Sequence, residues 1–138
     1  MKTLWFKSEF VAPILSGEMK ALTIRQPWAE AILSLGKDVE NRSWPTRYRG
    51  LLLIHAGAKR DDALCDALGL NPRVLTYGAI VGTVELVDCV RVANSKWAEP
   101  DQWHWVLRNA KRLDSPVICR GAQGLWNFGP ESQHSFGF

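Results

Sequence analysis

The feature that most constrains the fold of this chain is a series of short strand patterns with turn residues between them. These strands do not alternate regularly with helices. The patterns cover residues 21–25, 37–44, 48–56, 77–92, 117–119 and 125–128. A doubly wound parallel sheet needs a helix after nearly every strand, which this order does not supply. The sequence therefore predicts an α+β fold: a small mixed β-barrel of about five or six strands with helices packed at its rim.

Three segments have helical features. Residues 27–35 place apolar side chains at i, i+3, i+4 and i+7 and begin with Pro27, which is tolerated in the first helical turn. A second helix is predicted from the N-cap Asp61 to residue 68. A third is predicted to begin at Pro100 and to carry an apolar stripe as far as residue 110.

The 138 residues are enough for one domain with its own core. Residues 19–128 are predicted to form that domain, 1–18 an N-terminal extension that packs on it as a helix, and 129–138 a C-terminal tail. Polar residues interrupt every apolar stretch, so neither a membrane span nor a signal peptide is expected. The three cysteines form no Cys-x-x-Cys pair, which favours a reducing, cytoplasmic location. A monomer is expected.

Charge is unevenly divided along the chain. Residues 20–60 contain eight basic side chains against three acidic ones, a net of +5, whereas residues 61–90 carry a net of −4. The seven tryptophans include several with polar or charged neighbours. Bases of single-stranded nucleic acid stack on aromatic rings beside basic side chains. These features favour a basic, tryptophan-lined cleft that binds RNA, although burial in the core is the alternative for any single tryptophan.

The segment 37–42 contains the strongest candidates for binding or catalysis. A twist or bulge next to Gly36 would bring Lys37 beside Glu40 and Arg42. Such a cluster can bind an anion and support proton transfer, with the lysine as base or nucleophile. The alternative is a charged strand edge whose side chains only pair with one another. No nearby pair of His or carboxylate residues has convincing metal-ligand spacing, although a nuclease could use a hydrated Mg²⁺ or Mn²⁺.

Four stretches resemble a known family, the ASCH domain, a member of the PUA-like group of RNA-binding barrels. They are residues 22–29 (LTIRQPWA), the signature G-x-K-x-x-E-x-R with Lys37, Glu40 and Arg42, residues 49–56 (RGLLLIHA) and residues 121–126 (GAQGLW). Leu35 occupies the position of the signature glycine, and Gly36 follows one residue later. The resemblance implies a PUA-like barrel from about Met19 to Phe128.

The resemblance also implies a cleft lined by the signature residues. It is compatible with RNA binding, with cleavage of single-stranded RNA, or with amide hydrolysis of an acylated nucleoside such as N4-acetylcytidine. Lys37 and Glu40 are the catalytic candidates, although the amidohydrolase branch has a threonine where this chain has Glu40. The candidates for substrate binding are Gln26, Trp28, Arg42, Trp44, Arg47, Arg49 and His55. Among these, Gln26 is expected at a helix start that offers free N–H groups to an anion.

Overall fold

The computed structural model describes residues 19–129, so the predictions for 1–18 and 130–138 lie outside the described residues. The described part contains two helices, α2 (Trp28–Ser34) and α3 (Asp62–Ala67), which match the first two predicted helices. Its strands are β1 (Met19–Ile24), β2 (Val39–Arg42), β3 (Gly50–Ala56), β4 (Ala79–Val90), β5 (Trp103–Ile118) and β6 (Leu125–Phe128).

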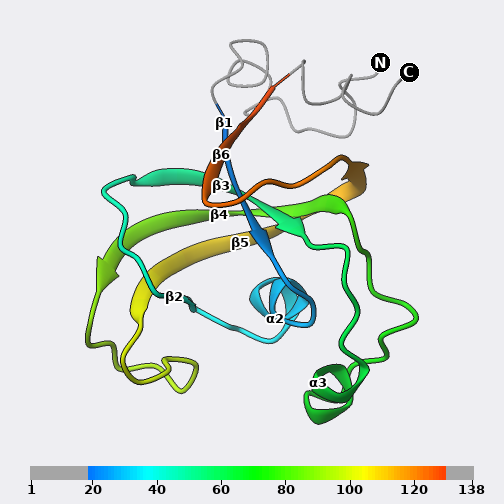
Figure 1. Cartoon of the computed structure of the whole chain (residues 1–138), viewed down its shortest axis with the longest axis horizontal. Helices are drawn as coiled ribbons and strands as arrows, with labels where there is room; N and C mark the ends of the chain where they lie inside the picture. Colours follow the sequence, from blue (N-terminus) through cyan, green and yellow to red (C-terminus); the bar gives the residue numbers. More distant parts are fainter. Residues whose placement is uncertain (1–18, 130–138) are drawn as a thin grey trace.

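The six strands form one mixed sheet in the order β2-β5-β4-β3-β1-β6 (Figure 1). β1 pairs with β3 in parallel, and all other neighbours are antiparallel. The sheet is not closed by hydrogen bonds between its edge strands in the described residues, but it curls strongly. As a result Arg42 on the edge strand β2 donates from Nη2 to the carbonyl oxygen of Thr23 on β1, at 2.7 Å. The expected α+β, PUA-like fold is confirmed.

The helix predicted from Pro100 is wrong, because this segment leads into the long strand β5. The residues of 103–106 pair with β2 on one side, and β5 pairs along most of its length with β4 on the other. Aromatic and β-branched side chains suit such a strand, and the helical spacing of the apolar residues is coincidental. The separate strand predicted at 117–119 largely coincides with the end of β5.

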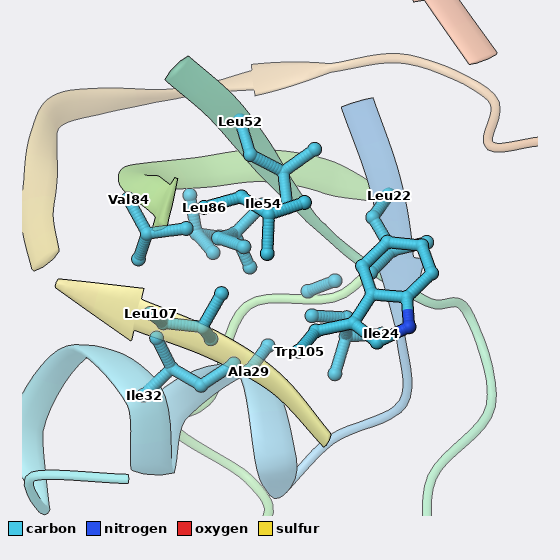
Figure 2. Close-up of a cluster of buried hydrophobic side chains, with 12 residues drawn as sticks. Leu22, Ile24, Ala29, Ile32, Leu52, Ile54, Val84, Leu86, Trp105 and Leu107 are labelled. Carbon is cyan, nitrogen blue, oxygen red and sulfur yellow. The ribbon is translucent and has the colours of Figure 1, made fainter. Parts of the chain in front are cut away.

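The core follows from the alternation of side chains along β1 and β3, which are buried on both faces. One cluster lies between the sheet and α2 and includes Leu22, Ile54, Ile32 and Trp105 (Figure 2). A second, separate cluster gathers Ala21, Leu53, Ile80 and Phe128, among others. Neighbouring residues of one strand thus enter different clusters, as the period of two requires. This packing fixes the ends of β1 and β3, where Thr23 and the candidate His55 lie.

Candidate functional site

The structure brings the three signature side chains together. The Lys37 ammonium lies 3.0 Å from Oε1 of Glu40, and Nε of Arg42 donates to Oε2 of Glu40 at 3.2 Å. Both carboxylate oxygens are therefore occupied by cations. We call these three residues the signature cluster. Their roles in binding or catalysis stay predictions.

The cluster forms because Lys37 lies before the strand and not in it. Gly36 has a φ of 72°, a left-handed conformation that suits glycine, and it turns the chain out of α2. The Lys37 side chain then folds over the Trp28 ring, 5.7 Å from its centroid, and donates to the carbonyl oxygen of Val39. Glu40 and Arg42 are two residues apart on β2 and share one face. Strand alternation therefore never separates Lys37 from Glu40.

The signature cluster is largely buried. The side chains of Lys37 and Glu40 are 4% and 10% exposed, and that of Arg42 is 23% exposed. The Lys37 ammonium already donates to two acceptors, the Val39 carbonyl oxygen and the Glu40 carboxylate. Arg42 links the cluster to β1 through Thr23. The arrangement joins the edge strand β2 to the opposite part of the sheet, and Arg42 is its most accessible member.

Gln26 does not present an open helix end. It is 1% exposed, and its side chain donates to the Thr76 carbonyl oxygen and accepts from the Glu30 N–H. The N–H groups of Trp28 and Ala29 both donate to the carbonyl oxygen of Arg25. The prediction of free N–H groups for an anion is therefore wrong, because the preceding turn and the Gln26 side chain already use them.

The predicted aromatic walls are half-buried. Trp28 packs on the core cluster below Lys37, and Trp44 packs edge-on against the buried Trp105, with ring centroids 4.7 Å apart. The Trp105 indole N–H donates to the Trp44 carbonyl oxygen. Core packing thus holds both rings, and each keeps only part of its surface available to a ligand.

Arg47 and Arg49 lie in the segment 43–49, which joins β2 to β3 and alternates between exposed and half-buried residues. Arg47 is exposed and has no ion-pair partner within residues 19–129. Arg49 donates to the carbonyl oxygens of Thr46 and Tyr48 and lies 3.6 Å from the Asp88 carboxylate. We call residues 42–49 the basic segment.

The division of charge along the sequence does not become a division in space. Arginines of the positive stretch pair with acids of the negative stretch. The pairs are Arg25–Asp61 at 3.1 Å, Arg60–Asp62 at 2.8 Å and Arg49–Asp88 at 3.6 Å. Ion pairs at a surface contribute little to stability, so these arginines remain able to exchange a carboxylate for a phosphate.

His55 belongs to a different cluster, at the ends of β1 and β3. Its Nε2 lies 2.7 Å from the carbonyl oxygen of Cys119, and its Nδ1 lies 3.2 Å from the Thr23 hydroxyl oxygen. A carbonyl only accepts, so we assign the proton to Nε2, and the Thr23 hydroxyl then donates to Nδ1. Burial lowers the pKa of His55, and the Cys119 contact offsets part of that effect. Burial therefore favours the neutral form of His55.

A cavity of about 530 Å³ opens beside this pair, and Thr23, His55 and residues 119–123 are among its lining. Among these lining residues, the sequence analysis predicts a role in binding for His55 but not for Thr23 or Gly121. It also predicts none for Trp126, which contacts Thr23 from outside the lining. In the sequence, residues 121–126 stand out only through their resemblance to the family. Their proximity to His55 depends on pairing between distant strands, which the sequence does not display.

Within the described residues, no three His, Cys, Asp or Glu side chains come together as ligands for a metal ion. The buried carboxylate of Glu40 is already shared by two cations. No helix in the described part of the chain is long and apolar enough to cross a membrane.

The α+β sheet, with the signature cluster at its edge strand, defines a PUA-like domain. Residues 22–117 match the ASCH domain, and the chain belongs to this family. The human protein "Activating signal cointegrator 1" is 32% identical over 118 residues, covering 75% of this chain and 19% of that protein. Its mouse counterpart is 27% identical over 124 residues, covering 76% and 21%. The chain thus spans about a fifth of the length of these curated relatives. The ASCH family is linked to RNA binding.

Proposed function

We propose that this chain is an RNA-binding module that holds single-stranded RNA along the basic segment. The observation that carries the proposal is the succession of Arg42, Trp44, Arg47 and Arg49 over eight residues, all at least partly exposed. Family membership supports the same function.

The contacts follow from the side-chain types. Arginine guanidinium groups donate paired hydrogen bonds to phosphate oxygens. Arg47 is available for such a contact, and the ion-pair partner of Arg49 in the described residues, Asp88, is exposed. The accessible part of Trp44 offers a surface on which a base can stack.

The test is fluorescence anisotropy with a labelled single-stranded RNA of mixed sequence, repeated over a salt series. Binding is expected to weaken as salt rises, with a slope of roughly −0.7 for each phosphate contacted. The double variant R47A/R49A should bind more weakly and lose about 1.4 from that slope. The control R73A/R108A removes the same charge from two other exposed arginines and should lose less. Absence of binding at low salt, or equal losses in both variants, would contradict the proposal.

A second candidate is a hydrolase that acts on RNA or on an acylated nucleoside. The 3.0 Å contact between Lys37 and Glu40 favours it, because a lysine and a carboxylate in contact can exchange a proton. To test this, the protein is incubated with labelled single-stranded RNA, with and without Mg²⁺ or Mn²⁺, and separately with N4-acetylcytidine. Cleavage of the RNA or hydrolysis of the amide is measured. Lys37→Met should lower any turnover by about 100- to 10,000-fold if the lysine takes part. Turnover that survives in a folded Lys37→Met protein comes from a contaminant or another site.

A further inference from the structure

The cavity beside His55 has a polar floor that offers an acceptor. The Trp126 indole N–H donates to Oγ1 of Thr23 at 3.2 Å, and the Thr23 hydroxyl in turn donates to His55. A hydroxyl oxygen has two lone pairs, and the Trp126 contact uses one. His55 has both ring nitrogens engaged. The floor therefore suits a ligand that donates an N–H or O–H to Thr23.

The walls of the cavity are made by small residues. Gly57, Ala58, Gly78 and Ala122 contribute little side-chain volume, so the space stays open. Gly121 lies so close to the floor that a Cβ there would be 2.3 Å from Oγ1 of Thr23 and 2.8 Å from Nδ1 of His55. The volume of about 530 Å³ falls within the range of small-molecule sites, about 300–1,000 Å³.

One basic residue lines the cavity, and a second follows a lining residue along the chain. Arg120 lines it, and Lys59 directly follows the lining residue Ala58. Both are exposed, and neither has an ion-pair partner in the described part of the chain. A ligand that combines a ring bearing an N–H donor with a phosphate matches both the floor and these two basic residues. A single nucleotide has this chemistry.

Thr23 connects the cavity to the basic segment. Its carbonyl oxygen accepts from Arg42, while its side chain forms the floor. The geometry points to one unstacked base of the bound RNA entering this cavity and donating to Thr23, with its phosphate at Arg120 and Lys59. This inference rests on the proposed RNA binding and adds a base-accepting site to it.

Two oligomers of equal length separate the inference from the proposed function. Oligoadenylate carries bases, and an abasic ribose-phosphate oligomer carries only the backbone. The wild type should bind both in a salt-dependent manner and should prefer oligoadenylate by on the order of tenfold. Failure of both to bind overturns the proposed function itself. Binding of both with no preference overturns the base-accepting site and the stacking on Trp44, and leaves the phosphate contacts of the basic segment standing.

The variant Ala122→Trp fills the cavity from an exposed position and leaves Thr23 and His55 intact. It should lower the base preference to the part that stacking on Trp44 supplies and keep the binding to the abasic oligomer. Ala67→Trp on α3 is the matched control, because residue 67 is exposed and does not line the cavity. Urea unfolding of both variants establishes that they fold. A base preference as large as that of the wild type in the folded Ala122→Trp protein contradicts the inference.

An NMR titration of the wild type with adenosine 5′-monophosphate, followed through the indole N–H signals, locates the bound base directly. The Trp126 signal should shift, because its N–H donates to the hydroxyl that receives the base. Shifts confined to Trp28 and Trp44 would place the base at the signature cluster and overturn the assignment to this cavity.

Discussion

Replacement of Glu40 by glutamine tests whether the signature cluster stabilises the fold. The substitution keeps the side-chain shape and removes the charge that holds two cations. The Lys37 side chain is only 4% exposed, so its ammonium would keep the Val39 carbonyl as an acceptor but lose its anion. Removing one partner of a buried ion pair costs about 3–5 kcal/mol. Because Arg42 is 23% exposed and can turn towards water, we expect the lower end, about 3 kcal/mol.

The assay is urea unfolding at neutral pH, followed by tryptophan fluorescence. Asp88→Asn is the control, because it removes the carboxylate of an exposed pair with Arg49 and should cost about 0–1 kcal/mol. The double variant Lys37→Met/Glu40→Gln should be less destabilised than the sum of its parts, because it leaves no buried ammonium without an anion. A loss for Glu40→Gln no larger than that for Asp88→Asn would refute the reasoning.

Three further predictions concern other parts of the fold. Because burial lowers the pKa of His55, the unfolded chain binds more protons than the folded one below about pH 6.5. The free energy of unfolding should therefore be full above that pH and fall as the pH drops towards the folded pKa. In urea unfolding measured over a pH series, His55→Gln should flatten this fall. Gly82→Ala should cost about 1–3 kcal/mol, because the added Cβ would lie 2.5 Å from a backbone oxygen of β5. Gly57→Ala, whose Cβ would meet its nearest atom at 3.6 Å, should leave the unfolding midpoint nearly unchanged. Burial raises the pKa of Cys119 to about 11, so a thiol reagent at pH 8 should label half-buried Cys89 first and Cys119 only on unfolding, as peptide mapping by mass spectrometry can show.

The sequence correctly predicts elements that depend on residues close together in the chain. The apolar stripe after Pro27 is α2, and Asp61 caps α3 by accepting from the Leu64 N–H. The apolar run that ends in His55 is β3. Each depends on residues a few positions apart, whose spacing the sequence displays directly. The prediction of a helix over residues 103–110 is wrong because the spacing of its apolar residues is compatible with either a helix or a strand. Only pairing with β2 and β4 decides between the two.

The sequence by itself determined the family, through its signature, and the α+β class, through its strand patterns. Only the tertiary structure decided how charges and polar groups are partnered. Arg49 meets Asp88 and Thr23 meets His55, although 39 and 32 positions separate them along the chain. These contacts form because curled, non-local strand pairing brings distant backbone segments together. The sequence gives the charge and polarity of each side chain, whereas the folded sheet decides which residues it contacts.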